Sequence, residues 1–225
     1  MAAKTHIQQD HARAQAPYGL QSRDLRKIDT SNMPQILTRA SSILLNLVYL
    51  KVLIQRDRVL ILDSHGSEPS KAEAAFIQNL LCNSPQKVAP GMPAPPYELK
   101  VLEAALSAVT AELENELNAL REPVLQVLME LEETISRENL RALLILSKQL
   151  STLEQQVRLV RDTVDEVLED SDMLSALYLT DVANWDMETT VTDAEFLFES
   201  YYNICDEIVQ DAKDLVSSVK STEDM

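Results

Sequence analysis

The chain has 225 residues, a formal net charge of −16 and only three glycines. This charge excludes nucleic acid and anionic lipid surfaces as partners of this part of the chain, because their phosphates require a basic face. The scarcity of glycine, together with an aromatic content of 4%, favours helices over a turn-rich β architecture. No apolar run reaches the ~20 residues that a membrane-spanning helix needs.

The N-terminal part of the chain predicts a small α/β lobe at residues 18–83. Residues 1–17 have no periodic pattern and are expected to be disordered. The segments QILTR and SILLNLV predict a hairpin, and YLKVLIQ and VLILD predict two more strands around a charged RDR turn. Residues 70–83 have helical spacing, with Ser70 as the N-cap and Glu73 at the capping-box position.

A proline-rich linker, residues 84–96, separates the lobe from a bundle of long helices at residues 97–225. Five of the nine prolines lie in the linker. Pro96 is expected at the first helical position, and Pro123 is expected to kink the first long helix. A second helix begins near Ser136, and its apolar positions form a heptad-like seam. These are Leu143, Leu146, Leu150, Leu153, Val157, Val160, Val164 and Val167.

The last part of the chain predicts one short helix, at residues 173–181, and a third long helix. A polar segment, 183–191, separates them. Thr192 and Glu195 make a capping box that is expected to open the long helix. No glycine or proline follows its apolar stripe, so we expect the helix to continue beyond Met225 in a longer protein. The stripe is Leu197, Tyr201, Ile204, Ile208, Ala212, Leu215 and Val219.

The acidic charge is concentrated in one stretch. Between Asp162 and Ala212 there are fifteen aspartates and glutamates and no lysine, arginine or histidine, so the rest of the chain is nearly neutral. We expect no neighbouring cation to neutralise these carboxylates. Five of them share one face of the second helix, where like charges destabilise the helix and oppose its dipole. They are Asp162, Asp165, Glu166, Glu169 and Asp170.

Two interpretations of the acidic face remain open. It is either a solvated face that keeps the protein soluble or a low-affinity site for divalent cations. Carboxylates without soft ligands suit Mg²⁺ or Ca²⁺ rather than Zn²⁺. Enzyme chemistry finds no support, because there is no nucleophile motif, no glycine-rich phosphate loop and no His/Cys cluster. Cys82 and Cys205 lie outside any metal or redox motif and are expected to be free thiols.

Six segments, in this order along the chain, resemble the matrix domain of the mitochondrial CorA-type magnesium channels of the inner membrane. The match runs from about Tyr18 to the end of the chain, and the fungal members are the most similar in sequence. The segments are YGLQSRDLRKID (18–29), ILLNLVYLKVLIQRDRVLILD (43–63), PYELKVLEAAL (96–106), LRALLILSKQL (140–150), VRDTVDEVLEDSDMLSALYLTD (160–181) and ESYYNICDEIVQDAKDLVSSVKSTED (199–224).

The resemblance implies an α+β fold, in which a small lobe of mostly antiparallel strands joins a bundle of long antiparallel helices. It also implies a homopentamer in the mitochondrial inner membrane, with this domain facing the matrix. The family's transmembrane helices and pore motif would lie beyond Met225, so this chain resembles the regulatory domain alone. Contact with the membrane would be made only by those missing helices.

Magnesium is both the transported ion and a regulatory ligand in this family, and its binding between or within protomers favours the closed pore. The resemblance places cation-sensing carboxylates at Asp24, Glu103 and Glu199. The acidic helix face adds Glu166 and Asp170 as candidate ligands. Tyr97 departs from the phenylalanine that is frequent after the family's proline, but it keeps the aromatic bulk.

Three alternatives stay open at this point. The first is that Asp24 only pairs with Arg23 or Arg26 at the surface. The whole chain could belong to a non-conducting paralogue that modulates the channel. It could also be an ion-independent helical scaffold that uses the heptad seam to bind a partner protein.

Overall fold

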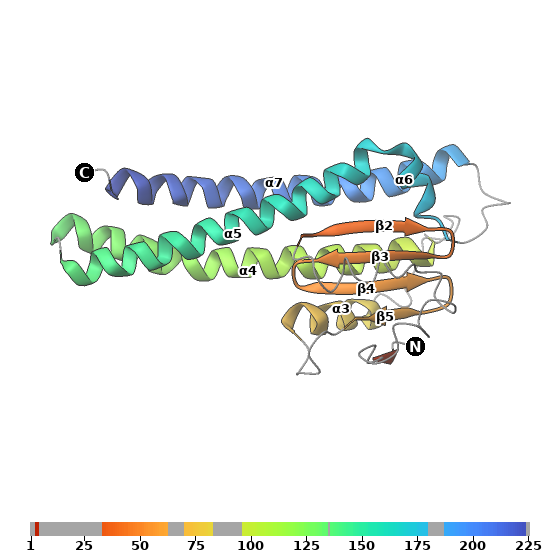
Figure 1. Cartoon of the computed structure of the whole chain (residues 1–225), viewed down its shortest axis with the longest axis horizontal. Coiled ribbons are helices and arrows are strands. Elements are labelled where there is room, and N and C mark those ends of the chain that lie inside the picture. Colours follow the sequence, from red (N-terminus) through yellow and green to blue (C-terminus); the bar gives the residue numbers. More distant parts are fainter. Residues whose placement is uncertain are drawn as a thin grey trace.

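The structure is a computed structural model that describes residues 3–4, 33–62, 70–82, 96–134, 136–179 and 187–223. Within these ranges, a five-stranded sheet lies at one end of an elongated molecule (Figure 1). The strand order is β1-β5-β4-β3-β2, antiparallel except for the β1–β5 pair. The strands are β1 (Ala3–Lys4), β2 (Gln35–Arg39), β3 (Ser42–Leu47), β4 (Leu50–Gln55) and β5 (Val59–Ile61).

The predicted hairpin and the following pair of strands are confirmed. β2 pairs with β3, β3 with β4, and β4 with β5 around the charged turn, where the Gln55 N–H donates to the Arg58 carbonyl at 2.9 Å. Of the N-terminal stretch expected to be disordered, the structure describes only β1, and the other residues lie outside the described ranges.

The central strands read as continuous apolar runs because both faces of the sheet are buried. Leu44 lies opposite Leu53, and Leu53 lies opposite Leu60, so these three share one face. Leu45 and Val52 face the other way, toward the helices. None of the five side chains is more than 4% exposed. Alternation of polar and apolar residues is therefore absent from β3 and β4.

Helix α3 (Lys71–Cys82) begins with the predicted capping box. The Glu73 N–H donates to Ser70 Oγ at 3.1 Å, and the Ser70 N–H donates to Glu73 Oε2 at 3.2 Å. These two bonds satisfy backbone donors that the first turn of a helix leaves unpaired. Phe76 is fully buried and fixes α3 in the core shared with the bundle.

Helix α4 (Tyr97–Glu133) differs in one detail from the expectation. Pro96 is its N-cap rather than its first helical residue, with an extended backbone whose carbonyl accepts the Lys100 N–H at 3.2 Å. Pro123 lies inside the helix, which runs to Glu133, and the kink expected at this residue stays a prediction. Helix α5 (Arg137–Glu169) starts as predicted, because Ser136 Oγ accepts the Asn139 N–H at 3.0 Å.

Helix α6 (Ser171–Ala176) is shorter than predicted and begins earlier. It begins at Ser171 because Asp170 Oδ1 accepts the N–H groups of Asp172 and Met173, at 3.0 and 3.1 Å. It ends at Ala176, where the next N–H, that of Leu177, turns back to the Leu174 carbonyl at 3.3 Å. The expected helix at residues 177–179 is therefore wrong, and residues 180–181 lie outside the described ranges.

Helix α7 (Met187–Glu223) begins before the predicted capping box. Thr192 lies inside the helix, so the box does not open it, and the polar segment expected up to residue 191 is helical from Met187 onward. Neither glycine nor proline lies between Met187 and Thr192 to stop the helix from extending in the N-terminal direction. A capping-box pattern alone did not mark the helix start.

The apolar stripe of α7 is wider than predicted. Phe198, Cys205 and Val209 are fully buried, one position after predicted residues of the stripe, whereas Ile204 is 37% exposed. Adjacent positions point about 100° apart on a helix. Because α7 packs against both α4 and α5, it uses two neighbouring rows of apolar residues. The predicted row is the one that includes Tyr201, which lies beside α4.

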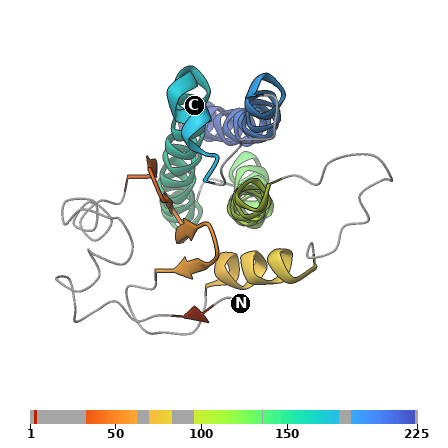
Figure 2. The same ribbon diagram turned by 90° about the vertical axis from the view of Figure 1, so that its right-hand side faces the viewer.

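One hydrophobic core joins the sheet, α3 and the bundle. Seen along the helices, α4, α5 and α7 cluster together, with α3 beside α4 and β2 beside α5 (Figure 2). The heptad-like seam of α5 lies inside this cluster: of its eight predicted residues only Leu146 is partly exposed. A smaller cluster of Val124, Leu131, Leu143 and Val219 closes the far end. Among the described helices, none is both long and apolar enough to cross a bilayer.

Candidate functional site

The acidic residues form a surface along the last turns of α5, along α6 and along α7 as far as Asp211. The end of α5, α6 and the start of α7 lie at the end of the bundle that carries the sheet (Figure 1). Solvent reaches most carboxylates of this surface, as a solvated face requires. Twelve of the fifteen acidic residues have described side chains, and Asp165 and Asp211 are the two of these that are partly buried. The exposed ones are Asp162, Glu166, Glu169, Asp170, Asp172, Asp193, Glu195, Glu199, Asp206 and Glu207.

Two arginines from neighbouring helices neutralise part of this surface, which corrects the expectation of no nearby cation. Arg161 of α5 donates from Nη1 to Asp206 Oδ1 of α7 at 2.9 Å. Arg121 of α4 forms an ion pair with Asp211 of α7. Neither arginine belongs to the stretch from Asp162 to Ala212. Arg121 is far from it in sequence, and Arg161 immediately precedes it. The two carboxylates are therefore already paired.

Glu103 and Glu199, two of the predicted cation-sensing residues, are both exposed and lie on neighbouring helices. Tyr201 of α7 donates its hydroxyl to the Glu103 carbonyl of α4 at 3.4 Å, which places Glu103 beside the segment that carries Glu199. Burial raises the pKa of Tyr201, and the negative charge of Glu103 adds to the rise.

Glu166 and Asp170 lie at the end of α5, both exposed. Asp170 is not part of the α5 face, because its side chain caps α6 through two backbone N–H groups. Its Oδ1 already accepts these two hydrogen bonds, which leaves Oδ2 as the freer oxygen. Asp24 lies outside the described residues.

The described residues contain no group of three or more His, Cys, Asp or Glu side chains arranged to hold a metal ion. A site of Zn²⁺ or Ca²⁺ type built from such side chains alone is therefore not formed by the described part of this chain. Mg²⁺ has different requirements, since it usually keeps several waters and takes one or two carboxylates. The exposed carboxylates of this surface are ligands of the type that Mg²⁺ takes in this mode.

Glu98 is a buried carboxylate that the sequence reasoning missed. It lies in the first turn of α4 and is only 1% exposed. Its Oε1 accepts the backbone N–H of Leu179 at 3.0 Å, which ties the segment after α6 to the start of α4. Beside it, burial raises the pKa of Tyr178 to about 12, and the charges of Asp193 and Glu98 add to the rise. The only signal for Glu98 in the sequence was its position in the first turn of a predicted helix, where acidic residues are common.

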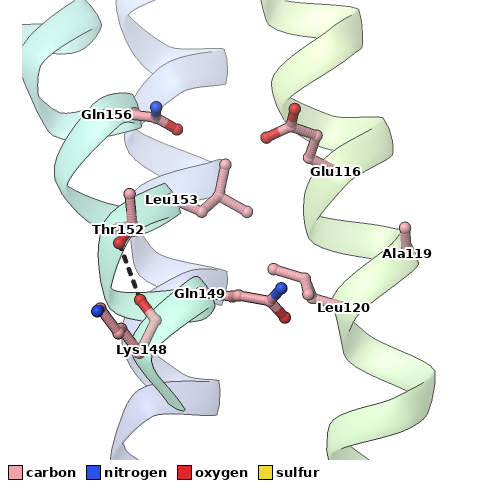
Figure 3. A pocket seen from close by; sticks show the side chains of 8 residues that line it. All are labelled: Glu116, Ala119, Leu120, Lys148, Gln149, Thr152, Leu153 and Gln156. Carbon is pink, nitrogen blue, oxygen red and sulfur yellow. Dashed lines mark hydrogen bonds between the residues drawn. The ribbon is translucent and has the colours of Figure 1, made fainter. Parts of the chain in front are cut away.

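The middle turns of α4 and α5 line a groove of about 430 Å³ (Figure 3). Ala119, Leu120 and Leu153 give it an apolar lining. Glu116 and Gln156 face each other across its upper end in that view. Tyr49 reaches this end from the β3–β4 turn and donates to Glu116 Oε2 at 2.7 Å.

A second cleft, of about 290 Å³, separates α4 from α7. Its walls carry the ion pair of Arg121 with Asp211, and the exposed Ile204 forms part of one wall. Glu114 and Glu207 also line it, so carboxylates outnumber the single arginine. The arginine Nε is buried without a hydrogen-bond partner among the described residues. The cleft thus joins the acidic surface of α7 to α4.

The chain matches the family model described as "Magnesium transporter MRS2-like" over residues 3–225. It is 50% identical over 212 residues to the "Mitochondrial inner membrane magnesium transporter mrs2" of Aspergillus fumigatus, covering 93% of this chain and 36% of the relative. The corresponding protein of Gibberella zeae is also 50% identical, with 93% and 40% covered. The chain therefore spans well under half the length of these relatives.

The fold is similar to that of the soluble domain of CorA from Methanocaldococcus jannaschii, with a TM-score of 0.66. The match covers all of this chain and 85% of that domain at 14% identity, so it bears on the fold alone. The α+β fold expected from the resemblance is confirmed. The relatives are named as transporters, in agreement with the expectation that the chain is not an enzyme. The chain belongs to the MRS2-like magnesium transporter family.

Proposed function

We propose that the chain is the regulatory, Mg²⁺-sensing matrix domain of a homopentameric magnesium channel of the mitochondrial inner membrane. Mg²⁺ bound by its acidic residues, between or within protomers, favours the closed state of the pore. Magnesium would thus be both the transported ion and a regulatory ligand. The observation that carries this proposal is an exposed acidic surface on α5, α6 and α7, in a chain of the magnesium transporter family.

The electrostatics of the surface support a response to divalent cations. Two carboxylates ~4 Å apart repel by about 4 kcal/mol at an effective dielectric constant of ~20. A bridging Mg²⁺ that keeps several waters replaces this repulsion with attraction. The paired positions Asp206 and Asp211 are excluded from that role by their arginines. The candidates that stay open to solvent are Glu103, Glu166, Asp170 and Glu199, and Asp24 joins them from the sequence.

Weak sites are sufficient for such a switch. Moving a two-state equilibrium from 1:99 to 99:1 requires about 5.5 kcal/mol of differential binding. In a symmetric pentamer, each of the five interfaces would contribute only about 1 kcal/mol of this free energy. Pairs of carboxylates between or within protomers would meet this requirement, because Mg²⁺ takes only one or two carboxylates and keeps several waters.

The test is a thermal melt of the purified chain in MgCl₂ and in NaCl of equal ionic strength. We expect millimolar Mg²⁺ to raise the melting temperature or shift the sedimentation coefficient beyond the effect of NaCl. Asp24→Ala or Glu199→Ala should reduce the Mg²⁺ effect. Equal responses to both salts would contradict the proposal and favour the ion-independent scaffold.

A second experiment separates a conducting channel from a modulatory paralogue. The full-length protein is expressed in cells that lack their own mitochondrial magnesium transporter, and mitochondrial Mg²⁺ uptake is measured. We expect uptake to be restored. Uptake that is absent alone but altered on co-expression with a conducting relative would identify the paralogue instead.

A further inference from the structure

The two interhelix ion pairs of α7 reach different neighbours. Arg161 on α5 pairs with Asp206, and Arg121 on α4 pairs with Asp211. Between Met187 and Ala212, α7 itself has no lysine or arginine. The cations that these two carboxylates contact are therefore supplied by the helices on which α7 packs. Each pair joins positions far apart in the sequence, by 45 and 90 residues.

We propose that Arg161 and Arg121 are tethered counter-ions that hold α7 against α5 and α4, and that Arg161 fills a position between Asp162 and Asp206 that a divalent cation would otherwise take. The inference assigns these carboxylates to the arginines and leaves the remaining acidic surface to respond to Mg²⁺. The part of this inference that concerns Mg²⁺ rests on the proposed function. The ion pairs are observed independently of it.

The geometry of Arg161 supports a bridging role. Nε and Nη2 donate to Asp162 Oδ1 at 3.1 and 2.8 Å, while Nη1 donates to Asp206 Oδ1 at 2.9 Å. One guanidinium thus contacts a carboxylate on each of two helices. The Arg161 side chain is 21% exposed and each carboxylate is 53% exposed. The cation is the more sheltered member of the trio, so solvent screens it less than an ordinary surface arginine.

Among the ion pairs of the described residues, Arg161 takes part only in those with Asp162 and Asp206. Cys205 is fully buried, and the charge of Arg161 acts to lower the pKa of its thiol. Burial outweighs this effect and raises the pKa of Cys205 to about 12, so the thiol stays neutral. The two aspartates therefore supply the negative charge that faces Arg161, and the three side chains together keep a formal net charge of −1.

Removal of the guanidinium would leave two carboxylates facing a gap at the α5–α7 contact. Mg²⁺ is commonly held by one or two carboxylates with its remaining waters retained. A divalent cation could then replace the missing positive charge. A tethered arginine differs from such an ion in that its occupancy does not depend on ion concentration. The packing of α7 against α5 at Arg161 would therefore not depend on the Mg²⁺ concentration. The remaining acidic surface would be the part that responds to Mg²⁺.

The test compares Arg161→Gln with Arg158→Gln in the whole chain. Arg158 is a matched control, because it lies one turn earlier on α5 and pairs with Glu154 of the same helix. Melting temperatures are measured first in EDTA and then in millimolar MgCl₂, with NaCl at equal ionic strength as the reference. In EDTA, we expect Arg161→Gln to melt about 2–4 °C below Arg158→Gln.

In MgCl₂, we expect the melting temperature of Arg161→Gln to rise more than that of the wild type or of Arg158→Gln. Adding Asp206→Asn to Arg161→Gln should abolish this extra rise, because it removes one of the two carboxylates. Equal melting of the two arginine variants in EDTA would overturn the inference. An equal Mg²⁺ shift in Arg161→Gln and wild type would overturn it as well, since the arginine would then only make hydrogen bonds.

The outcomes separate this inference from the proposed function. A wild type without any Mg²⁺ shift, beside an Arg161→Gln variant with one, would support the tethered counter-ion and contradict Mg²⁺ sensing. A wild type with an Mg²⁺ shift, beside an Arg161→Gln variant without one, would support Mg²⁺ sensing and contradict the tethered counter-ion. If Arg161→Gln does not fold, Arg161→Lys takes its place. Lysine keeps the charge but not the planar fork, so we expect a smaller loss in EDTA and a smaller extra Mg²⁺ shift, and no loss in EDTA would overturn the inference.

Discussion

The hydroxyl of Tyr49, in the turn between β3 and β4, donates to Oε2 of Glu116 on α4 at 2.7 Å. Gln156 Oε1 of α5 lies 3.4 Å from the same hydroxyl. A single side chain of the sheet thus reaches the two helices that form the apolar groove. Burial, with the hydrogen bond and charge of Glu116, raises the pKa of Tyr49 well above its usual value. The contact fixes the position of the sheet along the bundle.

Tyr49→Phe should lower the free energy of unfolding by about 1.5 kcal/mol, because it removes a hydrogen bond to a charged acceptor. Urea unfolding followed by circular dichroism measures the change. Tyr202→Phe is the control, since Tyr202 is also partly buried and the structure describes no hydrogen bond for its hydroxyl. A loss no larger than that of Tyr202→Phe would show that the contact does not stabilise the fold.

Glu98 should be needed to order the segment after α6. Glu98→Ala leaves the Leu179 N–H without its acceptor in a buried position, at a cost of about 1–3 kcal/mol. Glu98→Gln keeps an oxygen at the same place and should lose less. Hydrogen exchange measures the effect directly: we expect faster exchange at Leu179 in Glu98→Ala than in Glu98→Gln. Similar exchange in the two variants would contradict the assigned role.

Asp170 allows its capping role to be separated from cation binding. Asparagine is as good an N-cap as aspartate, whereas alanine costs about 1 kcal/mol. Asp170→Asn should therefore keep the stability measured in EDTA and reduce the Mg²⁺-induced rise in melting temperature. Asp170→Ala should reduce both. A full Mg²⁺ response in Asp170→Asn would remove this residue from the cation-sensing set and leave it as a helix cap.

Alkaline pH should destabilise the protein through its buried neutral groups. Burial raises the pKa of the Cys205 thiol from 9.0 to about 12, with the charge of Arg161 opposing the rise. A group whose pKa is higher in the folded state stabilises the fold below its unfolded pKa, and that stability is lost as pH rises. We therefore expect the free energy of unfolding to fall between pH 9 and 12. Tyr178 adds to the fall above pH 10.

The contribution of the thiol is isolated by substitution. Cys205→Ala should flatten the decline that begins near pH 9, whereas Cys82→Ala should leave it unchanged, because Cys82 is exposed. Urea unfolding at a series of pH values measures both. The same pH dependence in Cys205→Ala and wild type would show that the buried thiol does not account for the alkaline instability.

Local patterns predicted the elements that depend on nearby residues. The predicted Ser70–Glu73 capping box is a pair of bonds between residues three apart, and it is present. The helix start predicted near Ser136 is also present, where Ser136 Oγ caps α5. The strands were equally clear, since apolar runs separated by short polar turns permit few alternatives. The start of α7 was wrong because the same Thr-x-x-Glu pattern also occurs inside a helix, and the pattern contains no information about the residues before it.

Contacts across the bundle could not be predicted from periodicity. Arg121 and Asp211 are 90 residues apart, and only the packing of α4 against α7 brings them together. The same holds for Glu98 and Leu179. The acidic stretch was correctly located, but its composition could not show which carboxylates were already paired. The arginines that neutralise part of it come from other helices.

The most direct test of Mg²⁺ sensing is anomalous diffraction from crystals of the chain soaked in millimolar Mn²⁺, which replaces Mg²⁺ and scatters anomalously. We predict peaks beside carboxylates of the set Asp24, Glu103, Glu166, Asp170 and Glu199, and none beside Asp206 or Asp211, where arginines already lie. Peaks that Mg²⁺ in excess removes would identify them as magnesium sites. The absence of peaks at all five residues would contradict the proposed function.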